Sequence, residues 1–226
     1  MAIIQSGANS TVLQTVDPTF LAARSSERPP EILGAYQMTL TSGALTAVAA
    51  GATVYSFRWA PPTSTRLCMI RRVEVGFSTI TAFGAAQALQ YSLQIARAWN
   101  TADTVGTTGL FTQTNTGKFR TTMPTSAFAG GGQITIATTG AISAGTRTLD
   151  TQAIATVQGQ STAIGTVLTA TPIYQHQPGD YPIIFAANEG FILNNVQLMG
   201  ATGVINLIVN VEWMELAATT GSAIAY

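Results

Sequence analysis

The sequence predicts an all-β protein, an antiparallel β sandwich of jelly-roll type with an extended N-terminal arm. Apolar side chains recur at every second residue in several segments, and Gly and Pro turns separate those segments. No segment of about twelve or more residues has the apolar period of an amphipathic helix. About eight short strands joined in this way are typical of a sandwich or a jelly roll. With 226 residues, the chain is long enough to bury a core without a disulfide or a metal.

Residues 1–34 are expected to form the arm. They have no sustained apolar period, and they contain the doublet Pro29-Pro30. Stretched at about 3.3 Å per residue, they would span roughly 110 Å, which exceeds the width of a domain of this size. Such an arm would reach a neighbouring subunit. A frayed tail, or a short helix over 20–28, is the alternative interpretation.

The sandwich domain is expected over 35–226, with period-two strands from Tyr36 onward. Over 53–59 every second residue is aromatic, which predicts one buried face. That face consists of Tyr55, Phe57 and Trp59. The run 88–99 alternates most regularly, and its inward side chains are expected to be Leu89, Tyr91, Leu93, Ile95 and Trp99, with Arg97 falling in the same set.

The run 66–77 predicts a strand that is apolar on both faces, and therefore central in a sheet or located at an interface. Strict alternation gives one face as Leu67, Met69, Arg71, Val73, Val75 and Phe77, and the other as Cys68, Ile70, Arg72 and Glu74. Arg71 on the apolar face would pair with an acid across a subunit contact. Because Arg71 and Arg72 would lie on opposite faces, they would form no one-sided basic patch for nucleic acid.

Residues 100–150 are rich in Thr, Gly and Ala and are expected to form mostly long loops, with a short strand at 133–138. A poorly periodic stretch of this length is often functional or subunit-facing, and mere loop decoration is the alternative. Strands return over 181–187, 191–199 and 204–216. In the last of these, the side chains expected to point inward are Ile205, Leu207, Val209, Val211 and Trp213.

Charged residues are scarce in the chain. Only 9% of residues are Asp, Glu, Lys or Arg, against about 25% in an average soluble protein. Ten acids balance ten bases, which leaves no field to attract nucleic acid or an anionic membrane, and a net charge near zero favours association. No apolar run of about 18 residues predicts a membrane helix. Residues 1–7 lack the pattern of a secretory signal, so synthesis in a cytoplasm is expected.

No catalytic, cofactor-binding or metal site is predicted, and the chain is expected not to be an enzyme. The one histidine, His176, lies in a turn-like segment, so a metal site there would need carboxylates from distant parts of the chain. The one cysteine, Cys68, is expected to be a buried thiol. Glu212 and Glu215 are three residues apart in a strand and face opposite sides, so they are expected to solvate the strand end rather than act as a pair. Phosphate-binding and serine-nucleophile motifs do not occur.

The segment Val16-Asp17-Pro18-Thr19-Phe20-Leu21-Ala22-Ala23-Arg24, followed by Arg28-Pro29, resembles a family of small virion-associated structural proteins of tailed bacteriophages. Further similar segments follow in the same order and extend the resemblance over nearly the whole chain. They are SFRW at 56–59, IRRV at 70–73, TAFGAAQ at 81–87, TRTLD at 146–150, NEGF at 188–191 and MGATGV at 199–204.

The resemblance implies a non-enzymatic virion protein in repeated copies, with capsid decoration or cement as the leading assignment. Its expected partners are the major capsid protein and other copies of itself, as a homo-oligomer such as a trimer, and neither nucleic acid nor a membrane. The chain would be made in the host bacterial cytoplasm and reside in the virion. The alternatives are a tail, collar or head-fibre component, a polysaccharide depolymerase, and a carbohydrate-binding adhesive module. The adhesive module would need exposed Trp59, Trp99 or Tyr226 as a stacking platform.

Overall fold

The computed structural model describes residues 32–61, 65–109, 117–130, 133–177 and 180–217. The chain divides into two units, Met1–Pro30 and Glu31–Tyr226. The first unit lies outside the described residues, and with it the helix considered for 20–28 and most of the expected arm. The first strand of the second unit begins at Ile32, so the last three residues of the range expected for the arm belong to a strand.

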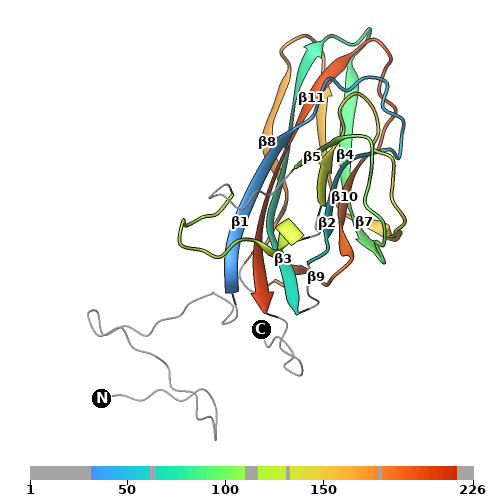
Figure 1. The fold of residues 1–226 in the computed structure, drawn as a ribbon. Coiled ribbons are helices and arrows are strands. Elements are labelled where there is room, and N and C mark those ends of the chain that lie inside the picture. Colours follow the sequence, from blue (N-terminus) through green and yellow to red (C-terminus); the bar gives the residue numbers. More distant parts are fainter. Residues whose placement is uncertain (1–31, 62–64, 110–116, 131–132, 178–179, 218–226) are drawn as a thin grey trace, which may run out of the picture. The chain divides into compact units, whose positions relative to one another are not determined.

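Within the described residues, the regular secondary structure of the second unit is almost entirely strand (Figure 1). The elements are β1 (Ile32–Thr41), β2 (Thr53–Trp59), β3 (Arg66–Thr81), β4 (Gln87–Arg97), β5 (Thr107–Gly109), the 3-10 helix η1 (Ala127–Gly130), β6 (Gln133–Ile136), β7 (Thr148–Ser161), β8 (Val167–Gln175), β9 (Ile183–Phe185), β10 (Glu189–Asn195) and β11 (Val204–Ala217).

Two antiparallel sheets pack face to face (Figure 1). One has the order β1-β11-β3-β8, with β9 also pairing with β3, and the other has the order β5-β6-β2-β10-β4-β7. Leaving out β5, β6 and β9, four strands remain in each sheet, in the orders β1-β11-β3-β8 and β2-β10-β4-β7. The chain passes from one sheet to the other at each step from β1 to β4 and again from β7 to β11. This is the strand order of a jelly roll, and the predicted all-β sandwich is confirmed.

The core between the sheets is rich in aromatic side chains. The predicted inward residues of β2 and β11, and those of β4 as far as Ile95, are all buried. The Trp213 ring lies at its centre, 5.6 Å from the ring centroids of Phe57 and Phe128 and 5.8 Å from that of Tyr36. Burial of such side chains at about 1.5–3 kcal/mol each is the main stabilising contribution to a sandwich that lacks disulfides.

One extra residue interrupts the alternation of β3. Its pairing with β11 shifts between Glu212, which faces Arg72, and Trp213, which faces Ile70. Arg71 is therefore the additional residue of a β-bulge. The predicted face assignment for the first half of this strand is wrong, because the bulge reverses the alternation. The side chains that enter the core from β3 are Cys68, Ile70, Val73, Val75 and Phe77.

Trp99 is buried, but on the opposite side of its sheet from the predicted one. β4 ends at Arg97, and Ala98 adopts a left-handed φ of 49°, which turns the chain over the outer face of the sheet. Arg97 is exposed there and pairs with Asp150 and Glu189, so its predicted inward position is wrong. The second, smaller core on this outer face consists of Trp99, Ala96, Ile192 and the half-buried Leu149.

The apolar period predicts neither β7 nor β8. Both lie at the edges of their sheets, and most of their side chains are exposed, so they show no alternation between apolar and polar residues. The described residues of the region 100–150 lie mostly in loops, as predicted, with only short elements before β7 begins. The predicted strand at 133–138 is present as β6.

Candidate interaction surfaces

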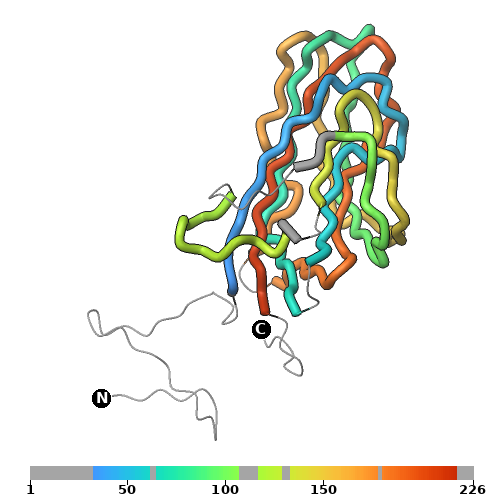
Figure 2. The backbone as a smooth tube through the Cα atoms, viewed as in Figure 1, coloured from blue at the N-terminus to red at the C-terminus, as the bar shows by residue number. Residues whose placement is uncertain are grey.

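Charged residues are absent from five long stretches of the domain, one of which, 121–146, contains η1 and β6. The other four are 32–57, 75–96, 151–179 and 190–211. Each of these four contains one connection between consecutive strands, namely β1–β2, β3–β4, β7–β8 and β10–β11. The four connections lie at the same end of the sandwich (Figure 2). That end therefore carries no formal charge.

We call this region the uncharged end and define it as the connections 42–52, 82–86, 162–166 and 196–203 with the adjoining strand ends. Hydrogen bonds join the connections to one another and to the strand ends. Thr79 N donates to Thr166 O at 2.9 Å, and Met199 N donates to Val48 O at 3.0 Å. The Gly84 N–H donates to Thr202 Oγ1 at 3.1 Å. Because its connections are bonded together, the uncharged end is one continuous surface.

Large apolar side chains are exposed at the uncharged end. Of the ten large hydrophobic residues that are exposed among the described residues, five lie here, namely Ile80, Ile164, Val167, Val196 and Leu198. Ile164 is 70% exposed and Leu198 is 66% exposed. Scattered single apolar residues are normal on a protein surface, but a concentration of them marks an interaction site.

An ion-pair network lies at the opposite end of the sandwich. There the Arg97 guanidinium contacts both carboxylate oxygens of Asp150, at 2.9 and 3.1 Å, and Glu189 at 3.2 Å. The hydrogen bond with Asp150 is the main reason that the pKa of Arg97 is raised. Since Arg97 and Asp150 are exposed, the network contributes little to stability.

Glu215 is fully buried, so the prediction that it solvates the strand end is wrong. Its carboxylate accepts hydrogen bonds from the Ser126 hydroxyl and the Ala127 backbone N–H, and it pairs with Arg66 at 3.1 Å. These contacts hold η1 against the sandwich, where Phe128 enters the core. Glu215 is therefore a structural anchor for the long loop region.

A buried ion pair fixes the loops that cover the outer face of the six-stranded sheet. Arg147 pairs with Asp103, and the exposed fractions of their side chains are 4% and 0%. The Arg147 guanidinium carbon lies 4.6 Å from the centroid of the Trp99 ring, and Nη2 donates to Thr53 Oγ1 at 3.0 Å. These contacts hold Trp99 over the second core, which is a structural role.

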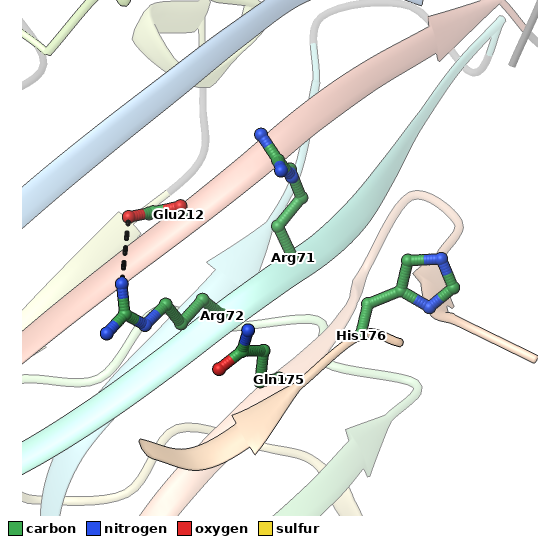
Figure 3. Close-up of a pocket in the computed structure, with 5 residues that line it drawn as sticks. All are labelled: Arg71, Arg72, Gln175, His176 and Glu212. Atoms are coloured by element: carbon green, nitrogen blue, oxygen red, sulfur yellow. Dashed lines mark ion pairs between the residues drawn. The ribbon is translucent and has the colours of Figure 1, made fainter. Parts of the chain in front are cut away.

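A small polar pocket lies on the outer face of the other sheet, at the Arg71 bulge (Figure 3). The side chains that line it are Arg71, Arg72, Gln175, His176 and Glu212. The two arginines share this face because both neighbouring residues, Ile70 and Val73, enter the core. The prediction that Arg71 and Arg72 lie on opposite faces is therefore wrong.

The stacking platform expected of an adhesive module is not formed by the tryptophans. Trp59 and Trp99 are both fully buried, and Tyr226 lies outside the described residues. Trp59 packs on Phe128 in the main core, at 5.7 Å between ring centroids. Neither tryptophan can therefore stack on a sugar at the surface of the folded domain.

Cys68 is buried as predicted, and burial, followed by the nearby Glu215 charge, raises the pKa of its thiol. Within the part of the chain that the structure describes, no three His, Cys, Asp or Glu side chains gather as metal ligands would. No helix in that part is long and apolar enough to span a bilayer. No family model, curated protein or solved structure matched this chain.

Proposed function

We propose that this chain is a non-enzymatic structural protein of a bacteriophage particle, and that it binds the assembled head and stabilises it as a decoration or cement protein. The observation that carries this proposal is the uncharged end, with its concentration of exposed apolar side chains. A surface without charges loses little hydration free energy when a partner covers it, because desolvation is costly mainly for charged groups.

The fold supports an assembly role without fixing it. Jelly rolls are the architecture of many viral capsid domains and also of lectins, and a fold alone does not determine function. Two further observations favour the virion: the resemblance of the segments from 16 to 204, and the buried position of both tryptophans that a lectin-like surface would require. The function is thus inferred from the surface together with the resemblance.

The stabilising mechanism needs no covalent chemistry. A protein that binds the assembled shell but not its free subunits shifts the assembly equilibrium toward the shell. Each contact can be weak, since many copies on one particle add their contributions. Residues 1–31, which precede β1, are proposed to act as an arm that reaches a neighbouring subunit, with the major capsid protein as the main partner.

Quantitative mass spectrometry of purified source particles tests the proposal. The copy number of this chain would be compared with that of the major capsid protein. We expect a ratio of the same order as that of the capsid subunit. A few copies per particle would overturn the head-wide role in favour of a tail, collar or fibre component, and absence from the particle would overturn the virion role itself.

A further inference from the structure

The bulge in β3 lies where the strand that pairs with β3 changes from β8 to β9. Arg72 pairs with Gln175 at the end of β8, whereas Ile70 pairs with Ile183 in β9. Arg71 falls between these two pairings and has no strand partner on that side. The His176 N–H instead donates to Arg71 O at 2.8 Å. The pairing along this side of β3 is therefore interrupted at Arg71, the residue that the bulge inserts. Bulges of this kind often redirect a side chain for function.

The two guanidinium groups in this pocket are in different electrostatic states. Arg72 is neutralised, because it pairs with Glu74 and lies 3.9 Å from a Glu212 oxygen. Arg71 is exposed and has no ion pair with any acid among the described residues. Figure 3 shows its side chain directed away from the Arg72–Glu212 pair. Arg71 is thus the guanidinium of this pocket without an acid partner among the described residues, although Arg71, Arg72, Glu74 and Glu212 together carry no net charge.

A second observation concerns the other wall of the pocket. The His176 Nδ1 atom is buried and has no hydrogen-bond partner within the described residues. The same is true of Arg72 Nε. Buried polar atoms in folded proteins nearly always have a partner, so an unpartnered pair in one small pocket needs an explanation. The Arg72 Nε–H is a donor, and a carboxylate oxygen bound in the pocket would accept from it.

We propose that this pocket binds a carboxylate side chain, an Asp or a Glu, of a neighbouring protein, with Arg71 as the principal contact. A carboxylate matches the planar fork of a guanidinium, with two parallel hydrogen bonds. With only one guanidinium that lacks an acid partner, the pocket suits one carboxylate, whereas a nucleic-acid backbone requires several basic groups along a track. The proposal rests on the proposed function only for the identity of the neighbour, which would be a protein of the particle.

The pocket can be tested on the full chain by NMR, without knowledge of the partner. The probe is the blocked peptide acetyl-Gly-Glu-Gly-amide, titrated at constant ionic strength, and acetyl-Gly-Gln-Gly-amide is its neutral counterpart. We expect saturable shifts of the Arg71 Nε–H and His176 ring signals with the Glu peptide only. Arg71→Gln should weaken this binding at least fivefold. Arg120→Gln, a change at another exposed arginine outside the pocket, should leave it unchanged.

Equal binding of the two peptides, or equal binding by the wild type and Arg71→Gln, would overturn the proposal. Inorganic phosphate and a 20-nucleotide single-stranded DNA complete the titration, and tighter saturation by either of these would also overturn it in favour of a phosphate site.

A second experiment separates this proposal from the proposed function. Arg71→Glu and Arg120→Glu chains would be added to particles that lack the protein, and bound copies would be counted. We expect the number of bound copies to fall at least tenfold for Arg71→Glu, while its melting temperature stays unchanged. Arg120→Glu should bind like the wild type. If the wild type itself does not bind particles, the proposed function fails, while the peptide titration still decides whether the pocket takes a carboxylate. If Arg71→Glu binds particles like the wild type, the pocket is not part of the contact.

Discussion

Both carboxylate oxygens of Glu215 accept a hydrogen bond of 3.0 Å from the backbone N–H of Ala127, which lies 88 residues earlier in the chain. This contact joins the last strand of the sandwich to a loop region that has almost no secondary structure of its own. Because the carboxylate is fully buried, its charge is stabilised, within the described residues, by the Ala127 N–H, the Ser126 hydroxyl and Arg66.

Replacement of Glu215 by Gln should therefore destabilise the domain strongly. Removal of one member of a buried ion pair costs about 3–5 kcal/mol, and we expect the lower end because Arg66 keeps partial access to water. Urea unfolding followed by tryptophan fluorescence measures the change. Glu212→Gln is the matched control: it lies on the outer face of the same strand and should cost no more than about 1 kcal/mol. If the two variants lowered the free energy of unfolding equally, burial of the Glu215 carboxylate would not be the cause of the loss of stability.

Phe128 should be essential to the fold although it comes from the loop region. Its ring lies 4.9 Å from that of Phe57 and is 2% exposed. Phe128→Ala is expected to cost about 3–5 kcal/mol, as large deletions in a core do. Phe119→Ala changes a side chain that is 46% exposed in the same region, and its cost should stay within about 0.5 kcal/mol. Thermal unfolding compares the two, and a small loss for Phe128→Ala would place the loop outside the cooperative unit.

The buried tyrosines should make the domain sensitive to alkali. Burial raises the pKa of Tyr55 and of Tyr91 above their ordinary value, which is near 10. Above about pH 10, the unfolded chain releases phenolic protons that the folded chain retains. The stability contribution of these groups is therefore fully present below about pH 10. It falls as the pH rises further, by up to about 1.4 kcal/mol per pH unit for each group.

Tyr55→Phe isolates this effect. The Tyr55 hydroxyl is buried without a hydrogen-bond partner in the described residues, so its removal should leave stability at pH 7 equal or higher by about 1 kcal/mol. The alkaline fall in stability should become shallower. Urea midpoints at pH 7 and above pH 10 measure both quantities. A variant that is much less stable at pH 7, with the same alkaline slope, would mean that the hydroxyl has a partner that stabilises it.

Charge placed at the uncharged end should abolish particle binding without unfolding the domain. Ile164→Glu and Leu198→Glu alter side chains that are 70% and 66% exposed, so the melting temperature should hardly change. Binding to particles should fall at least tenfold, because a carboxylate would have to be desolvated in the contact. Phe119→Glu, at a site that is 46% exposed and bonded to Ala35 at the opposite end of β1, is the control. Normal binding by all three variants would exclude the uncharged end as the contact.

The inner faces of the strands could be predicted where the alternation is uninterrupted. β2 and β11 are of this kind, and their aromatic and branched residues enter the core as expected. The bulge in β3 was not foreseeable, since Met69 and Ile70 are both apolar and either could fill the core. Trp99 could not be placed either, because Ala98 adopts a left-handed conformation that alanine seldom takes.

The surfaces of the domain could be predicted from the sequence only in part. Strands β7 and β8 lie at sheet edges and bury few side chains, so no periodic pattern marks them. The stretches without charges are visible in the sequence, and four of them are each centred near a turn. Their meeting at one end depends on the jelly-roll order, which no local pattern contains. The pocket at Arg71 depends on the bulge and was therefore hidden as well.

Hydroxyl-radical footprinting of the chain, free and bound to source particles, tests the central claim that the uncharged end binds the shell. Reactivity at Ile164, Val167 and Leu198 should fall on binding, while Phe119, which lies away from this end, keeps its reactivity. Unchanged reactivity of the three residues in the bound chain would contradict the claim and assign the contact to another surface.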